Sequence, residues 1–386
     1  MISIKKYASL SIIAAISLIF SSAALAAPSA SSVAALKAVI TKKKNAAADS
    51  PAKITAGRNS GGANPLYAAA HVRSVTEWAF LPADETENRI RVKKFRFKYD
   101  PDGNLIESES YDRDEKSPSR SLFKYSGGKK TASYDYAADG SLESSCLLRY
   151  DSSENLVEES TYYGRELDKK TVRSYDASRR LVKEICYSGR GGIEYKYIYK
   201  YNEKGNPTEE TVFGANGSAE YRTVYKYDPA GTLFERSNYD IDSTLMESTH
   251  FKFDGSGNMT EESQYAAGGG LISKTSYKYN DSGTLIEQIM YSGTDSVKTY
   301  ICRYDVSGNK IMESGFNNEG DVNFKIFYKY DARGNLLCES RFNSSGTIDF
   351  KFTYRYDEKN LPVEKIEFGK QNEPDTITRY TYEYYN

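Results

Sequence analysis

A segment of about 26 residues is repeated along most of this chain, and the repetition limits what the chain can fold into. One copy, Ile326 to Phe342, reads Ile-Phe-Tyr-Lys-Tyr-Asp-Ala-Arg-Gly-Asn-Leu-Leu-Cys-Glu-Ser-Arg-Phe. Each copy has an anchor, an aromatic residue that in most copies directly precedes the Asp or Asn of a turn, and nearly every copy has a second aromatic residue twelve positions later. The anchors are Tyr99, Tyr125, Tyr150, Tyr175, Tyr201, Tyr227, Phe253, Tyr279, Tyr304, Tyr330, Tyr356 and, after a longer loop, Tyr384.

Each copy has the pattern of a β-hairpin. Phe95, Phe97 and Tyr99 alternate with basic residues, which is the period of two expected of a strand. The next residues, Asp100 to Gly103, read Asp-Pro-Asp-Gly and match a type I turn closed by a glycine with positive φ. We therefore expect two antiparallel strands in every repeat.

The turn also predicts which residues share a face of the sheet. Pairing across it places Tyr99 opposite Leu105 and Phe97 opposite Glu107. One face then carries the anchors, the second aromatic residues and a Glu eight positions after the anchor. The other face carries basic and aliphatic residues.

The Glu on the expected aromatic face has two interpretations. It accepts hydrogen bonds from neighbouring Tyr hydroxyls and stays partly hydrated, since an unpaired buried carboxylate is costly. Alternatively, a ladder of carboxylates and Tyr rings lines a groove for a ligand. The candidate ligand-binding residues on this second interpretation are Tyr99, Glu107, Tyr201, Glu209, Tyr227, Glu235, Tyr279 and Glu287.

Residues 92–386 are therefore expected to form one all-β domain of tandem antiparallel β-hairpin repeats, with roughly 23 strands. At about 4.8 Å per strand a flat sheet would be about 110 Å wide, and open sheets of that size normally curl. We expect one long curled or coiled sheet. The period alone leaves a coiled shell, a superhelical ribbon and a closed ring as possible products.

The residues before the repeats differ in composition. Residues 1–26 have two lysines, an apolar run and an Ala-Leu-Ala site, which is typical of a secretory signal peptide. Residues 27–70 are rich in Ala, Ser, Lys and Gly, as in a low-complexity linker. Residues 71–91 are expected to add a strand that caps the repeats, with Trp78 as a cap residue.

The charges argue against two classes of protein, nucleic-acid-binding proteins and integral membrane proteins. The chain has 52 basic and 53 acidic side chains, so the basic surface of a nucleic-acid-binding protein is missing. The Lys or Arg that precedes most anchors is expected to pair diagonally with a Glu nine positions after the anchor, as Lys200 with Glu210. Charges on both faces of the sheet argue against contact with lipid, so we do not expect an integral membrane protein.

No catalytic or metal-binding pattern is found. The two histidines, His71 and His250, have neither a metal-ligand spacing nor a nucleophile and base spacing. The turns supply one or two carboxylates each, too few for a calcium site. We expect no enzyme activity, no cofactor and no metal.

The motif Tyr-x-Tyr-Asp-x-x-Gly-Asn-Leu, seen at Tyr328 to Leu336 and closely at Tyr197 to Asn206, resembles the YD repeat of the bacterial Rhs and toxin-complex families. The resemblance covers about three quarters of the chain. It implies β-ribbons that wind into a hollow shell and bind carbohydrate, with a C-terminal toxin in the larger members. We expect here a short member without the toxin domain.

Two functions are compatible with these features. The first is a secreted, non-catalytic repeat protein, periplasmic or at the cell surface, that binds a ligand, most simply a glycan stacked on Tyr rings. The second is a structural or assembly protein of the cell envelope. In that case the last strand, Thr381 to Tyr385, would be an unprotected edge that pairs with another chain or envelope protein.

The four cysteines are Cys146, Cys186, Cys302 and Cys338, an even number that suggests two disulfides in an exported chain. The expected register places the members of each consecutive pair three strands apart. Three strand spacings are about 14 Å, whereas a disulfide needs Cα atoms within roughly 7 Å. We predict four free thiols.

Overall fold

Nearly all of the described chain consists of antiparallel strands, as the alternation of aromatic and charged residues predicts. The computed structural model describes residues 63–83, 86–112, 116–293, 297–369 and 371–386. The expected signal peptide and most of the expected linker lie outside these residues. The elements are α2 (Pro65–Ala69), β1 (Val72–Ala83), β2 (Thr86–Tyr99), β3 (Leu105–Ser110), β4 (Ser119–Ser126), β5 (Lys129–Tyr136), β6 (Leu142–Tyr150), β7 (Leu156–Tyr163), β8 (Glu166–Tyr175), β9 (Leu181–Ser188), β10 (Ile193–Tyr201), β11 (Pro207–Gly214), β12 (Ala219–Tyr227), β13 (Leu233–Asp240), β14 (Leu245–Phe253), β15 (Met259–Ala266), β16 (Leu271–Tyr279), β17 (Leu285–Ser292), β18 (Val297–Tyr304), β19 (Lys310–Phe316), β20 (Val322–Tyr330), β21 (Leu336–Asn343), β22 (Ile348–Tyr356), β23 (Pro362–Phe368) and β24 (Pro374–Tyr384).

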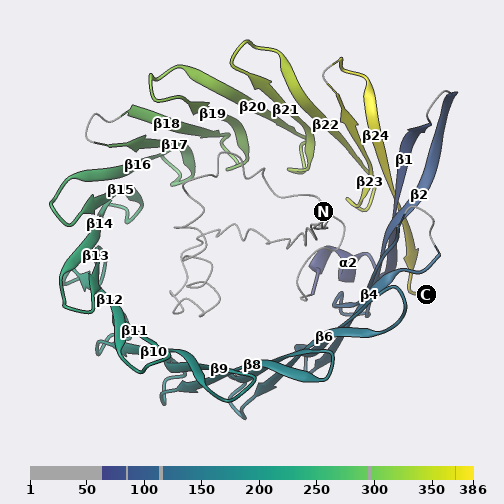
Figure 1. Ribbon diagram of the computed structural model, residues 1–386. Helices are drawn as coiled ribbons and strands as arrows, with labels where there is room; N and C mark the ends of the chain where they lie inside the picture. The colour runs from purple at the N-terminus through teal and green to yellow at the C-terminus, as the bar shows by residue number, and fades with distance from the viewer. Residues whose placement is uncertain (1–62, 84–85, 113–115, 294–296, 370) are drawn as a thin grey trace, which may run out of the picture. The chain divides into compact units, whose positions relative to one another are not determined.

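The sheet closes on itself (Figure 1). Each strand pairs with the next one along the chain, and the last strand, β24, pairs with β1, for example Val75 with Tyr382 and Thr76 with Thr381. The all-β prediction is confirmed, and of the three expected products the structure has the closed ring. The prediction that Thr381 to Tyr385 is an unprotected edge is wrong, because β1 occupies that edge.

The turns after the anchors have the predicted form and are held by side chains. In the turn after Tyr330, Gly334 has a φ of 84°. The Asp331 carboxylate accepts hydrogen bonds from the backbone N–H of Arg333 and Asn335 at 2.8 Å, and from Nδ2 of Asn335. These contacts explain the recurring Asp-x-x-Gly-Asn as a self-contained turn.

A β-bulge after every such turn changes the predicted faces. Tyr99 pairs with Leu105 as expected, but Lys98 pairs with Glu107, and Ile106 between them has no partner in the register. One extra residue moves every following side chain to the opposite face. The expected pairing of Phe97 with Glu107 is therefore wrong, since Phe97 pairs with Ser108.

The anchor tyrosines connect one repeat to the next. The hydroxyl of Tyr227 donates to the carbonyl of Pro207, twenty residues earlier, at 2.7 Å. The same contact recurs in most repeats, and its last example is Tyr382, which donates to the carbonyl of Pro362 at 2.6 Å. The last anchor is therefore Tyr382, in register with Tyr356, and not Tyr384 after a longer loop.

Helix α2 identifies the inner face of the ring. Its Tyr67 packs edge-on against Tyr99, with ring centroids 4.8 Å apart, and Figure 1 shows α2 on the inner side of the sheet. Asn64 caps the helix and Pro65 begins it, as at many helix starts. The anchors therefore point inward, and the stretch expected to be linker up to residue 70 contains a helix that belongs to the core.

All four cysteines are free, as predicted. Cys186 and Cys302 are buried, and Cys146 and Cys338 are partly buried. The bulges also place Cys302 and Cys338 on opposite faces, because Cys302 pairs with Glu313 whereas Cys338 pairs with Lys329.

The turn glycines provide a first test of the fold. We expect Gly334→Val to lower the free energy of unfolding by about 1 to 2 kcal/mol, because a β-branched residue does not tolerate the φ of 84°. Gly334→Asn is the matched control, with a smaller loss, since Asn360 has a φ of 68° at the same place in another repeat. Urea denaturation measures both variants, and equal midpoints for Val and the parent would contradict the assigned turn.

Gly189 provides a second test, for a different reason. A Cβ at this position would overlap the backbone carbonyl of Leu167 in the neighbouring strand β8. Backbone atoms cannot move aside as a side chain can, so we expect Gly189→Ala to cost about 2 kcal/mol. Gly268→Ala is the control, because nothing lies within 4 Å of the added Cβ there. Equal thermal unfolding midpoints for the two variants would show that the chain around Gly189 is not packed as described.

Candidate functional site

A row of carboxylates lies on the inner face, nine positions after the anchors. The bulge places these residues opposite the residues that precede the anchor by two, so that Glu210 pairs with Tyr199 and Glu339 with Tyr328. Four of the six are buried. The row consists of Glu159, Glu184, Glu210, Glu262, Glu313 and Glu339.

Glu313 on β19 is at the centre of the densest group. Its side chain is 1% exposed. Tyr328 donates to one carboxylate oxygen at 2.9 Å, Tyr300 donates to the other, and Nζ of Lys310 lies 2.6 Å from the first. Burial raises the pKa of Glu313 to about 7, against the hydrogen bond from Tyr328, because desolvation disfavours the ionised form.

Glu339 on β21 lies beside this group and is less well satisfied. The residue is 3% exposed, and its Oε1 has no hydrogen-bond partner among the residues that the structure describes. Burial raises its pKa, while Lys365 and Lys310 act in the opposite direction. A buried acceptor without a donor is expensive, so the Glu339 carboxylate can accept a hydrogen bond from a ligand.

A pocket shares Tyr328 with this group, although neither Glu313 nor Glu339 lines it. It lies between two successive turns, and its lining includes Asp305, Asn309, Ile311, Tyr328, Tyr330 and Arg333. Tyr328 thus contributes to the pocket wall while its hydroxyl holds Glu313. The group around Glu313 and Glu339, with Tyr300, Tyr328, Tyr330 and Lys310, is named the acid–tyrosine cluster below.

A second group on the inner face is neutralised by its own residues. Arg173 donates to Glu184 at 2.7 Å and to Glu159 at 3.1 Å. One guanidinium between two carboxylates satisfies much of the charge, so this group is best explained as structural. Glu184 is 1% exposed, and its pKa is raised by burial despite Arg173.

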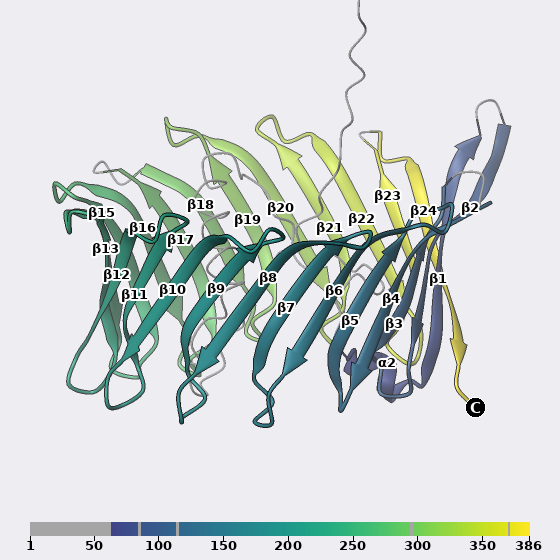
Figure 2. The same cartoon turned by 60° about the horizontal axis from the view of Figure 1, so that its bottom comes forward.

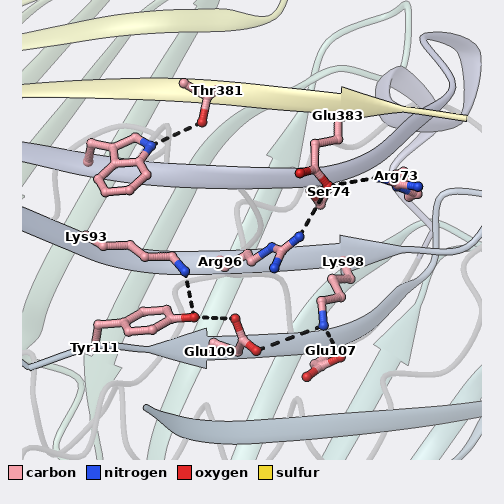
Figure 3. A network of polar contacts seen from close by, with 11 residues as sticks. Arg73, Ser74, Lys93, Arg96, Lys98, Glu107, Glu109, Tyr111, Thr381 and Glu383 are labelled. Atoms are coloured by element: carbon pink, nitrogen blue, oxygen red, sulfur yellow. Dashed lines mark hydrogen bonds and ion pairs between the residues drawn. The ribbon is translucent and has the colours of Figure 1, made fainter. Parts of the chain in front are cut away.

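The eight residues selected from the sequence are not brought together. The four glutamates lie on the outer face, where Glu107, Glu209 and Glu235 pair with the basic residue before the anchor at 2.7 to 2.8 Å (Figure 3 shows Lys98 and Glu107). Glu287 likewise pairs with Arg303 at 3.1 Å. The expected diagonal pairs with the Glu nine positions after the anchor are therefore also wrong.

The selected tyrosines are on the inner face, but their hydroxyls are engaged or covered. Tyr201, Tyr227 and Tyr279 each donate to a backbone carbonyl of the preceding repeat at 2.7 to 2.9 Å. Tyr99 is 2% exposed beneath Tyr67. These side chains hold the ring together, so the predicted Tyr and Glu ladder does not exist as one surface.

The second aromatic residues also lie outside, contrary to the prediction. They are covered by basic side chains: Nζ of Lys196 is 3.9 Å from the centre of the Phe213 ring, and Nζ of Lys351 is 4.8 Å from that of Phe368. Such cation–π contacts at exposed sites contribute about 0.5 to 1 kcal/mol each. The outer face thus combines ion pairs with covered rings.

The sequence contained a signal for the inner carboxylates that the expected register hid. A Glu at the ninth position follows a Glu at the eighth in several repeats, as in Glu209 and Glu210. Without a bulge the eighth residue would point inward, and with the bulge the ninth residue does.

Among the described residues no group of three or more His, Cys, Asp or Glu side chains could hold a metal ion. No helix in the described part of the chain is long and apolar enough to cross a membrane.

Comparison with known proteins gives distant likenesses. A family model described as an uncharacterised protein matches residues 250–377. No curated protein matches the sequence. The resemblance to the YD-repeat family therefore stays a prediction.

Among solved structures, the crystal structure of TcdB2-TccC3-TEV is 11% identical with a TM-score of 0.26, over 75% of this chain and 21% of that one. The Tc holotoxin pore of Photorhabdus luminescens is 14% identical with a TM-score of 0.27, over 74% of this chain and 19% of that one. This chain thus spans about a fifth of those chains. A porin-like protein from Bacteroides uniformis is 8% identical with a TM-score of 0.24, over 81% and 98%. At these TM-scores the likenesses assign no activity.

Proposed function

We propose that the protein is an exported, non-catalytic binding protein whose inner face takes a polyhydroxylated ligand, a glycan, at the acid–tyrosine cluster. The observation that carries the proposal is the buried Glu339 carboxylate with an unused oxygen, in the cluster whose Tyr328 and Tyr330 also line a pocket. Carboxylates accept hydrogen bonds from sugar hydroxyls, and Tyr rings stack on the apolar faces of sugar rings.

The charge of the cluster fits a neutral ligand. Burial raises the pKa of both Glu313 and Glu339, and the Lys310 ammonium lies 2.6 Å from Glu313, so the cluster carries little net negative charge. An anionic ligand would meet two carboxyl groups, so a neutral ligand rich in hydroxyl groups is favoured. The alternative role in assembly required an unpaired edge at β24, and β1 pairs with that edge.

A glycan array probed with the chain from Ala27 onward tests the proposal. We expect binding that is lost in a Glu313→Gln/Glu339→Gln double variant, because both acceptors are weakened while side-chain volume is kept. Adjacent residues on opposite faces supply a second comparison: Glu262→Gln alters the inner row, and Glu261→Gln alters outer-face contacts with Lys252 and Ser263.

The outcomes separate clearly. Binding by the parent but not by the double variant, with Glu261→Gln unchanged, supports the inner face. Binding that falls with Glu261→Gln and not with the double variant would move the site to the outer face. No glycan bound by the parent would reject the proposed ligand class.

A further inference from the structure

A second row of polar side chains lies on the inner face, on other strands than the acid–tyrosine cluster. Side chains alternate along a strand, so Gln264, two residues after Glu262, shares the inner face with it. The strands that carry the row, β12 to β16, pair consecutively and form the part of the ring wall on the left in Figures 1 and 2. The row, named the amide row below, consists of Thr223, Asn238, Glu247, Gln264 and Ser273.

The members of the amide row hold one another in place. The Glu247 carboxylate accepts one hydrogen bond from Nδ2 of Asn238 and one from Nε2 of Gln264, both at 2.8 Å. The Thr223 hydroxyl donates to Oδ1 of Asn238 at 2.8 Å, and the Ser273 hydroxyl donates to Oε1 of Gln264 at 3.4 Å. These bonds connect all five strands, so a ligand would not have to order the side chains that it meets.

The two amides of the row keep about half of their hydrogen-bonding capacity. An amide nitrogen has two N–H groups and an amide oxygen accepts two hydrogen bonds, and the row uses one of each. Asn238, Glu247 and Gln264 are only partly buried, so the remaining groups are accessible from inside the ring. A sugar hydroxyl both donates and accepts, as these groups require. Both oxygens of Glu247, the one charged member, are already bonded, which favours a neutral ligand.

Two groups beside the amide row fit the same kind of ligand. Arg236, two residues before Asn238, donates through Nη2 to Thr249 at 3.2 Å, whereas its buried Nε has no hydrogen-bond partner among the described residues. The half-buried Phe251 pairs with Glu262 on the inner face, and its ring is a surface on which a sugar can stack. A buried donor without an acceptor is costly, and a hydroxyl of a stacked sugar would satisfy it.

We propose that the amide row, with Arg236 and Phe251, is a second sugar-binding site, and that the ligand is a linear neutral oligosaccharide that reaches from this site to the acid–tyrosine cluster. The strands β14 and β20 are six strand spacings apart, about 29 Å along the sheet, so a disaccharide cannot contact both sites. Gln288 on β17 lies between the sites, and its Oε1 accepts a hydrogen bond from Tyr304 at 3.5 Å, so polar side chains continue from one site to the other. This inference rests on the proposed function, from which it takes the glycan class.

Binding of a chain-length series tests the inference. The probes are linear neutral oligosaccharides of glucose, mannose, xylose and N-acetylglucosamine, from the disaccharide to the octasaccharide of each, titrated into the chain from Ala27 onward. For a backbone that binds, we expect the affinity to rise at least about tenfold from the shortest to the longest member. The reason is that the second contact becomes intramolecular once the first is made.

Two variants locate the second site. Asn238→Leu/Gln264→Met is expected to remove the gain with length and to leave disaccharide binding at the acid–tyrosine cluster, because it removes only the amide contacts. Phe251→Leu keeps every hydrogen bond of the row and is also expected to reduce the gain, so it keeps the test valid if the first variant misfolds. Tyr265→Leu is the matched control, since it removes an aromatic ring from the outer face of the same repeat.

The outcomes separate this inference from the proposed function. Equal affinity for short and long probes, lost for both in Glu313→Gln/Glu339→Gln, would overturn the inference and leave the proposed function standing. A gain with length that neither Asn238→Leu/Gln264→Met nor Phe251→Leu changes would also overturn it. No binding of any probe by the parent would reject the proposed function and this inference together.

Discussion

A chain that ends at Asn372 is expected to lose its cooperative fold or to associate through the exposed strands. The truncation removes β24, and with it Tyr380 and Tyr382, which pack in the core cluster with Tyr67 and Val75. Loss of a buried aromatic side chain costs about 3 to 5 kcal/mol, so two of them exceed about 5 kcal/mol. That loss is comparable to the whole stability of many proteins.

Light scattering and urea denaturation measure the effect. The matched control is Glu383→Gln, which keeps β24 and removes the ion pairs with Arg73 and Arg96 at 3.2 Å across the seam (Figure 3). The side chains of Arg73 and Glu383 are about half exposed and that of Arg96 is 30% exposed, so this change should cost less than about 1 kcal/mol. A truncated chain that stays monomeric with an unchanged midpoint would show that β24 does not close the ring in solution.

Stability is expected to fall as the pH rises from 4.5 to about 7, and Glu313 is the residue responsible for a large part of the fall. Its pKa is about 7 in the folded chain and 4.5 in the unfolded chain. The folded state therefore binds more protons between these values. The resulting stability is fully present below pH 4.5 and is lost as the pH passes through about 7.

The difference amounts to about 3.5 kcal/mol at most, because the two pKa values differ by about 2.5 and one pKa unit corresponds to about 1.4 kcal/mol. Tyr300, Tyr328, Lys310, Glu339 and Arg341 are the other titratable or charged groups that act on Glu313. They remain in Glu313→Gln, so the gap between the parent and variant curves isolates this carboxyl group.

Glu261→Gln is the control for the pH measurement. The pKa of Glu261 is lowered from 4.5, first by its hydrogen bond from Lys252. Its contribution is present above pH 4.5 and is lost as the pH falls below that value, so the window from 4.5 to 7 should not change. Denaturation midpoints measured between pH 4.5 and 7 and below pH 4.5 test both expectations. Parallel curves for the parent and Glu313→Gln between pH 4.5 and 7 would disprove the burial argument.

The hairpins could be predicted because their determinants are local. Asp331, Gly334 and Asn335 form their turn with bonds that span five residues, so the pattern specifies the conformation wherever it occurs. The alternation around Tyr330 specifies the strand in the same way. The free cysteines followed from strand spacing.

The face on which each candidate site residue lies depends on one extra residue in each repeat, the bulge. The sequence pattern did not reveal this bulge. The bulge at Ile106 turns Glu107 outward to Lys98, and the same shift turns Glu313 inward to Tyr328. Side chains alternate between the two faces of a strand, so one inserted residue moves every following side chain to the other face. The inner carboxylates were therefore visible in the sequence but assigned to the wrong side.

The repeat, the turns and the all-β class follow from local sequence patterns. Closure of the sheet, and the choice of carboxylates that face inward, depend on the tertiary structure. Closure pairs Val75 with Tyr382, residues about three hundred positions apart, and joins Tyr385 to Tyr99 through a hydroxyl hydrogen bond. The twist and curvature summed over all strands determine whether such distant edges meet, and no single repeat contains that sum.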